Sequence, residues 1–385
     1  MADGTPPATT AATAATAAVA EPADTTLTVS DLTVEFATGE GTVHAVRGMS
    51  FSLAPEEVLG IVGESGSGKS VTALSIMGLL AKNARVGGSI TFGARELIGL
   101  KEKQLAEVRG VGVAMVFQDP MTSLHPVYTI GWQIAEAVQA HRDVSKEEAM
   151  AKAVSLLELV GIPNAVERAR NYPHEFSGGM RQRVVIAIAM ANDPQVILAD
   201  EPTTALDVTV QAQVLGTLRT ALEETRASLL LITHDLGVIA GMADRVLVMY
   251  AGRPVEIGTA EEIFYTPAMP YTHGLLGSLP RLDGQGAERL RQIPGAPPSL
   301  TSEPVGCPFA PRCPLRQAIC DEQEPPLRPV TVPASAAPTA DGGIAPVAAG
   351  AEPHQAACHF ADAVAEMPTA SMFPDASGDQ EGLPS

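Results

Sequence analysis

Residues 58–70 read Val-Leu-Gly-Ile-Val-Gly-Glu-Ser-Gly-Ser-Gly-Lys-Ser, an apolar run that leads directly into a glycine-rich loop and a lysine. The apolar run predicts a buried strand, and residues 63–70 match the pattern G-x-x-x-x-G-K-[ST] without a mismatch. In this pattern backbone N–H groups surround a phosphate, and the helix that follows directs the positive end of its dipole at the same anion. The stretch therefore predicts a nucleoside triphosphate site on an α/β fold.

The residues of this phosphate loop have separate roles. Lys69 can reach the β- and γ-phosphates, and the hydroxyl of Ser70 is a candidate Mg²⁺ ligand. We expect the nucleotide to contact the loop and the start of its helix, at Gly63, Ser65, Gly66, Gly68, Lys69, Ser70 and Val71.

A second apolar run ends in two acids. Val196 to Ala199 predict a buried strand, and Asp200 and Glu201 follow it directly. Asp200 is suited to a direct or second-shell contact with Mg²⁺, and Glu201 is suited to positioning and activating the attacking water. The two motifs together predict a nucleoside triphosphatase.

A third motif narrows the class. Ser177, Gly178 and Gly179 form a turn at the start of a predicted helix, which is a second anion site. Because one phosphate loop suffices for one nucleotide, we expect this turn to serve a γ-phosphate held by another subunit. Residues 176–182, Phe-Ser-Gly-Gly-Met-Arg-Gln, resemble the Leu-Ser-Gly-Gly-Gln signature of the ABC ATPase family, with Phe in place of Leu and Met in place of Gln.

The resemblance implies roles for further residues in chain order. Gln118 resembles the Q-loop glutamine, which senses the γ-phosphate and completes a Mg²⁺ set with Ser70 and Asp200. Asp207 resembles the acid of the D-loop. His234, which follows an apolar strand, resembles the switch histidine that holds the γ-phosphate and orients Glu201.

The adenine contact is less sharply defined by the sequence. Phe36 occupies the position of the aromatic residue that stacks on adenine in this family, and nearby Phe51 and His44 are alternatives. Catalysis is thus assigned to Glu201, His234 and Gln118, with ATP and Mg²⁺ as the bound species.

The resemblance implies an α/β fold of the P-loop NTPase type, an ABC ATPase domain with a mostly parallel sheet, an antiparallel β subdomain and a helical subdomain, followed by a small cysteine-containing C-terminal extension. We expect a disordered leader over 1–25, rich in Ala, Thr and Pro, and the ATPase domain over 26–266. The extension is expected over 267–361, with a disordered insertion near 329–352, and a disordered tail over 362–385.

Within the family, two stretches resemble the ATPases of dipeptide, oligopeptide and nickel importers. They are the Q-loop region Phe-Gln-Asp-Pro-Met-Thr-Ser-Leu-His-Pro at 117–126, where His125 replaces the usual Asn, and Asp-Glu-Pro-Thr-Thr-Ala-Leu-Asp-Val-Thr at 200–209. We therefore expect the chain to power import of short peptides. Nickel, glutathione or another small solute is the alternative.

The only four cysteines of the chain, Cys307, Cys313, Cys320 and Cys358, all lie after position 300. They resemble the C-terminal extension of the same branch, in which four such cysteines hold a [4Fe–4S] cluster in some members. Four thiolates are the ligands that such a cluster requires. Zinc is an alternative, although no tight C-x₂₋₄-C pair is present, and four reduced thiols that pack the extension are a third.

Composition bears on partners. The net charge of −19 argues against nucleic-acid binding and against docking on anionic lipid by charge alone. Neither a secretory signal nor a stretch able to span a bilayer is apparent. We therefore expect a peripheral protein on the cytoplasmic face of the cell membrane, held by two membrane permease subunits and served by an extracytoplasmic solute-binding protein.

The single ATPase domain requires a second ABC ATPase subunit to complete its sites. The resemblance favours a paralogous chain over a second copy of this one. A soluble ABC ATPase without a transporter is the alternative from another functional class. Against it, no sustained heptads lie between Ser70 and Ser177.

Overall fold

The computed structural model describes residues 26–39, 41–204, 206–278, 292–331, 353–368 and 372–373. The leader predicted over 1–25 and most of the insertion predicted near 329–352 lie outside these residues. Within the described part of the chain, no helix is both long enough and apolar enough to cross a membrane.

The centre of the fold is an eight-stranded sheet with the order β11-β12-β10-β9-β3-β8-β7-β6. Five neighbouring strands, from β9 to the edge strand β6, are parallel and almost wholly buried, as expected for strands covered on both faces. These five are β3 (Val58–Val62), β6 (Val113–Val116), β7 (Val196–Asp200), β8 (Ser228–Ile232) and β9 (Arg245–Tyr250). Because the strands are parallel, the residues that follow β3, β7 and β8 meet at one edge of the sheet.

A separate four-stranded antiparallel sheet packs beside it, with the order β2-β1-β4-β5. Its strands are β1 (Leu27–Thr38), β2 (Gly41–Leu53), β4 (Ala84–Phe92) and β5 (Arg95–Glu96). Alternate residues of β1, such as Leu27 and Val29, are buried in a core shared with Leu59 and Ile61 of β3. The antiparallel subdomain is therefore fixed to the strand that carries the phosphate loop.

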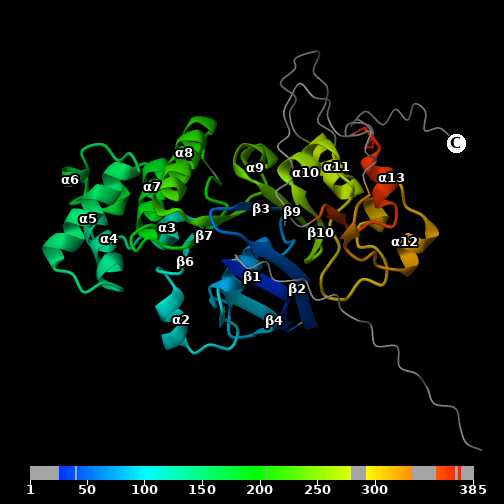
Figure 1. The fold of residues 1–385 in the computed structure, drawn as a ribbon, viewed down its shortest axis with the longest axis horizontal. Helices are drawn as coiled ribbons and strands as arrows, with labels where there is room; N and C mark the ends of the chain where they lie inside the picture. Colours follow the sequence, from blue (N-terminus) through cyan, green and yellow to red (C-terminus); the bar gives the residue numbers. More distant parts are fainter. Residues whose placement is uncertain are drawn as a thin grey trace, which may run out of the picture.

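Helices pack around the main sheet, and some of them form a helical group at one end of the molecule. Helices α4 to α7 gather at the end opposite to α12 and α13, with the antiparallel sheet between them (Figure 1). The helices up to the extension are α1 (Lys69–Ile76), α2 (Glu102–Val108), α3 (Pro120–Ser123), α4 (Ile130–Gln139), α5 (Lys146–Leu159), α6 (Ala165–Arg168), the 3₁₀ turn η1 (Pro173–Glu175), α7 (Gly178–Ala189), α8 (Val208–Thr225), α9 (Leu236–Met242) and α10 (Ala260–Tyr265).

The C-terminal extension is built into the main sheet. Strand β12 (Gln355–Ala356) pairs with β10 (Arg253–Thr259), and β11 (Arg328–Pro329) pairs with β12. Its helical elements are α11 (Pro270–Gly277), the 3₁₀ turn η2 (Ala310–Arg312), α12 (Ala318–Glu322) and α13 (Ala361–Ala365). The extension therefore shares one core with the ATPase part.

Two details differ from the expected boundaries. Helix α13 spans Ala361–Ala365, and Phe373 is buried against Phe309, so the tail predicted from 362 is structured at its start. Pro329 lies in β11, so the first residue of the predicted disordered insertion belongs to a strand. In both places a few apolar residues pack on the core of the extension, and segments this short give no periodic pattern in the sequence.

Candidate functional site

The phosphate loop connects β3 to α1, as expected. Gly68 has a φ of 103°, in the left-handed region, and a Cβ there would collide with the carbonyl oxygen of Ala45. Gly63 has a φ of 155°, and a Cβ there would collide with the carbonyl oxygen of Met249. Only glycine fits these two positions, because the loop lies directly against the backbone of β2 and β9.

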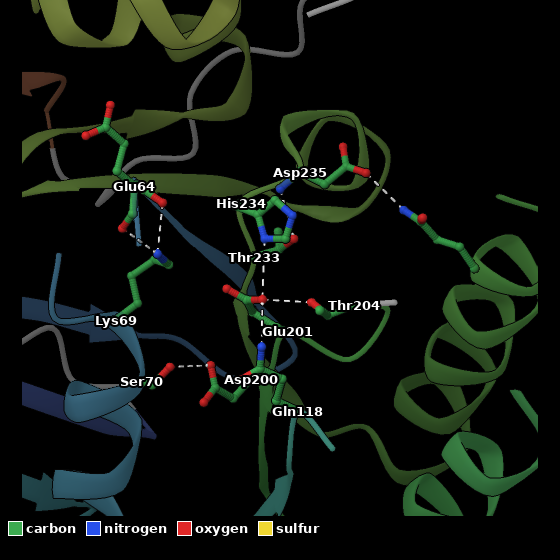
Figure 2. Close-up of polar contacts among 12 residues, drawn as sticks. Glu64, Lys69, Ser70, Gln118, Asp200, Glu201, Thr204, Thr233, His234 and Asp235 are labelled. Atoms are coloured by element: carbon green, nitrogen blue, oxygen red, sulfur yellow. Dashed lines mark hydrogen bonds and ion pairs between the residues drawn. The ribbon is translucent and has the colours of Figure 1, made fainter. Parts of the chain in front are cut away.

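Lys69 is buried at the base of the loop and is held by the loop itself. Its Nζ donates to the carbonyl oxygens of Gly63, at 2.8 Å, and Glu64, at 2.9 Å (Figure 2). Burial lowers the pKa of Lys69, and the nearby carboxylates of Glu201, Asp200 and Glu64 oppose that shift. A bound triphosphate offers this ammonium stronger acceptors than two carbonyl groups.

Ser70 and Asp200 form the candidate Mg²⁺ site. The hydroxyl of Ser70 donates to Oδ1 of Asp200 at 2.9 Å. Burial raises the pKa of Asp200, and the hydrogen bond from Ser70 counters this. With the side-chain oxygen of Gln118, these groups supply the hard oxygen donors that Mg²⁺ takes in partial coordination alongside water and phosphate, so the residues fit the ion.

Glu201 is the centre of the site. Its Oε2 accepts hydrogen bonds from Gln118 Nε2 at 3.1 Å and from Thr204 Oγ1 at 2.7 Å, and it lies 3.4 Å from Nδ1 of His234 (Figure 2). Glu201 also has a φ of 47°, a strained conformation for a residue with a side chain. All three residues predicted to act in catalysis are thus brought together on one carboxylate oxygen.

Two neighbours of this group are not in the predicted set. Thr204 lies three residues after Glu201, in the turn that follows β7, and its hydroxyl donates to the Glu201 carboxylate. Asp235 caps α9, and its Oδ2 accepts from Gln211 Nε2 at 3.0 Å, which ties the segment carrying His234 to α8. Hydroxyl and acidic residues are so common after strands that neither position stood out in the sequence.

The predicted signature turn lies at the start of α7. Ser177 is its N-cap and accepts from the backbone N–H of Met180, whereas Asp207 caps α8 in the same way. Gly179 faces α8 so closely that a Cβ would collide with Val210. Ser177 and Gly178 are exposed, and within the described residues no hydrogen bond or ion pair joins this turn to the phosphate loop. The predicted site residues thus fall into two separate groups.

The adenine contact can be narrowed. Phe51 is only 4% exposed in the core between the sheets, so its ring has no free face for a base. Phe36 lies on β1 and is half-buried. His44 lies on β2, with its Nδ1 3.3 Å from Oε1 of Glu35. Phe36 remains the predicted adenine residue, with His44 as the alternative.

The four cysteines come together in the extension. All are free, and Cys307, Cys313, Cys320 and Cys358 line one cavity of about 20 Å³. Burial raises the pKa of Cys313 to about 11 and that of Cys358 to about 12, so both are neutral thiols in this state. In the described part of the chain, however, no group of three or more His, Cys, Asp or Glu side chains is arranged to hold a metal ion. The predicted [4Fe–4S] cluster therefore has no support from metal-ligand geometry.

Comparison with protein families identifies both parts of the chain. Residues 46–204 match the ABC transporter family, and residues 255–320 match the C-terminal region of oligopeptide and dipeptide transporters. The oligopeptide transport ATP-binding protein OppD of Salmonella typhimurium is 53% identical over 79% of this chain and 91% of its own length. The dipeptide transport ATP-binding protein DppD of Bacillus subtilis is 55% identical over 78% of this chain and 90% of its own length.

A solved structure supports the same fold. The dimeric post-hydrolysis state of the ATP-binding cassette MJ0796, bound to ADP and Pi, is similar over 61% of this chain and 98% of its own, with a TM-score of 0.55 and 26% identity. The predicted ABC ATPase fold is thereby confirmed. The chain belongs to the ATP-binding subunits of oligopeptide and dipeptide ABC transporters.

Proposed function

We propose that this chain binds and hydrolyses ATP to drive import of short peptides through a membrane transporter. The observation that carries the proposal is the convergence of Gln118, Thr204 and His234 on one oxygen of Glu201, beside a complete phosphate loop. The names of the relatives support peptide as the solute.

The chemistry follows from the positions of the side chains. When the triphosphate enters, Lys69 exchanges its two carbonyl acceptors for phosphate oxygens. Ser70 and Asp200 would hold Mg²⁺, which would offset the negative charge on the phosphoryl group during its transfer. Glu201 orients the attacking water and accepts its proton, and His234 moves from the carboxylate to the γ-phosphate. Catalysis consists of positioning and electrostatic stabilisation.

The exposed signature turn supports a composite site. We propose that Ser177 and the N-terminus of α7 meet the γ-phosphate of a second ABC ATPase subunit, which the family resemblance suggests is a paralogous chain. Hydrolysis then requires two subunits to close on two nucleotides. Exposure of Ser177 and Gly178 is consistent with this role, because an anion site must be open until its ligand arrives.

A second exposed surface supports attachment to membrane subunits. Met121, Val127, Tyr128 and Trp132 are each at least 40% exposed, and they follow Gln118 along the chain. Apolar side chains exposed together mark interaction sites. We propose that two permease subunits bind here, that this holds the chain on the cytoplasmic face of the membrane, and that an extracytoplasmic solute-binding protein delivers the peptide.

The solute can be tested in cells that lack this chain. Restoring the gene is expected to restore growth on a di- or tripeptide as the sole source of a required amino acid, and a Glu201→Gln variant is expected not to. Uptake of radioactive nickel and of glutathione is measured in the same strains. Restoration of either of these, without any effect on peptide uptake, would contradict the proposal.

We also propose that the four cysteines ligate a [4Fe–4S] cluster with a structural role. Their convergence from four segments on one cavity supports the proposal, because four thiols are the donor set that the cluster uses. Thiols must become thiolates to bind metal, so these four residues would hold the cluster only after losing their protons. Anaerobic purification should give about four iron and four sulfide per chain. A colourless preparation without iron would contradict the cluster.

A further inference from the structure

We infer that Arg312 is a positioning residue for the phosphate loop, through which the C-terminal extension sets the affinity for ATP. The inference rests on the proposed ATP-dependent function. It assigns a role in nucleotide binding to a residue that lies in the extension, on the turn η2 between Cys307 and Cys313.

Arg312 makes a two-pronged ion pair with the second residue of the phosphate loop. Its Nη1 donates to Oε2 of Glu64 at 2.8 Å, and its Nη2 donates to Oε1 at 2.9 Å. The guanidinium is itself fixed, because Nε donates to the carbonyl oxygen of Pro294 at 2.9 Å and Nη1 donates to Tyr250 at 3.2 Å. The side chain of Arg312 is only 6% exposed. A planar fork that matches a carboxylate in this way fixes direction as well as distance.

The backbone of Glu64 is held from the same side. Its N–H donates to the hydroxyl of Tyr271, on α11, at 2.9 Å. The ring of Tyr271 packs against those of Tyr250 and Phe309, and Phe309 belongs to the segment that carries Arg312. The extension therefore binds both the side chain and the backbone of Glu64 in the phosphate loop.

Fixing Glu64 fixes the rest of the loop. The carbonyl oxygen of Glu64 accepts from Lys69 Nζ, at 2.9 Å, and from the N–H of Ser67, at 3.2 Å. The loop is otherwise rich in glycine, which costs more conformational entropy to order than any other residue. A loop already held in place pays less of this cost when it binds a nucleotide, and the affinity is correspondingly higher.

The pair also bears on charge. Glu64 places a carboxylate in the loop that must receive a triphosphate, and that carboxylate already acts on Lys69. Arg312 neutralises it. Loss of Arg312 would leave a free anion beside the phosphates, which opposes ATP binding in addition to loosening the loop.

The test uses the full-length chain and a fluorescent ATP analogue with Mg²⁺, with affinity measured by titration and folding checked by thermal unfolding. Arg312→Ala is expected to weaken nucleotide binding by about 5-fold to 150-fold, the usual range for coupling between linked sites. Arg312→Lys keeps the charge and loses the fork, so it should fall between Ala and wild type. In ATPase assays the loss should appear in KM more than in kcat.

Glu64→Gln, combined with Arg312→Ala, separates positioning from a general loss of stability. Because the double variant has no unpaired carboxylate, it should bind the nucleotide more tightly than Arg312→Ala alone. Arg316→Ala is the matched control, since Arg316 lies in the same extension and pairs with Asp321 at the surface without touching the loop. It should bind like wild type.

The outcomes distinguish the two levels of inference. A wild-type chain that fails to bind the nucleotide would overturn the proposed function and this inference with it. A wild-type chain that binds, with Arg312→Ala binding equally well, would overturn only the role of Arg312. An equal loss in Arg316→Ala would also overturn it, because the effect would then not depend on the contact with Glu64.

Discussion

The nucleotide site and the C-terminal extension treat their charged groups in opposite ways. At the nucleotide site the side chain of His234 is 62% exposed and that of Glu201 is 17% exposed, and Nδ1 of His234 lies 3.4 Å from Oε2 of Glu201, so this contact is open to a ligand from the solvent side. Where the extension joins the main sheet, His354 of the extension pairs with Glu256 of β10, with Nε2 of His354 2.8 Å from Oε1 of Glu256 and side chains that are 3% and 0% exposed, respectively. The exposed contact at the nucleotide site can be replaced by contacts with a ligand, whereas the buried pair has no access to one.

Each region should therefore respond to substitution in its own way. Substitutions at the nucleotide site should change binding or rate with little change in stability. Substitutions in the extension should change stability, apart from Arg312, whose buried ion pair reaches across to the loop.

Lys69→Ala should lower the affinity for ATP at least about a hundredfold, because two charge-assisted hydrogen bonds of about 1.5 kcal/mol or more each are lost. Equilibrium binding of a fluorescent ATP analogue measures it. Lys82→Ala is the control, since Lys82 is an exposed lysine just beyond α1. Binding by Lys69→Ala that matches this control would remove Lys69 from the site.

Ser177→Asp should abolish most hydrolysis by the assembled transporter while leaving ATP binding by the isolated chain unchanged. Aspartate caps a helix as well as serine does, so α7 should keep its stability. The added charge would repel the γ-phosphate of the partner subunit. Phosphate release is compared with that of Ser177→Asn, which has the same size and capping ability without the charge. Equal rates for the two variants would contradict a composite site.

His354→Ala should have the smallest effect on hydrolysis and should lower the free energy of unfolding by about 1–3 kcal/mol, the cost of leaving a buried polar group without its partner. Glu256 would keep only its contact with the backbone N–H of Ala268. Chemical denaturation measures the change, with His359→Ala as the control because His359 is less buried in the same extension. A fall in ATP affinity at unchanged stability would break the division between the two regions.

The nucleotide site could be predicted well from the sequence because its residues follow buried strands. The stretches ending at Val62, Ala199 and Thr233 predict buried strands of a largely parallel sheet, and the carboxyl ends of neighbouring parallel strands lie at one edge. Glu201 and His234 are therefore brought together by topology alone. Thr204 was missed because nothing about a threonine in a turn distinguishes it from a solvent-exposed one.

The extension could be predicted only in part. Its cysteines were expected to lie together, and they do line one cavity. The pairing of Arg312 with Glu64 joins residues 248 positions apart, and no local pattern records such a contact. Strand β12 has only two residues, too few for any periodicity, so its place in the main sheet could not be foreseen.

The role of Glu201 in hydrolysis is tested by comparing ATP binding and phosphate release in wild type and Glu201→Gln, measured on the full-length chain with its transporter partners. Glutamine keeps the shape of the side chain and cannot accept a proton from water. The account predicts that the variant binds ATP as tightly as wild type, remains in a closed ATP-bound dimer, and releases phosphate about 10²-fold to 10⁴-fold more slowly. Equal rates of phosphate release in the two proteins would contradict it.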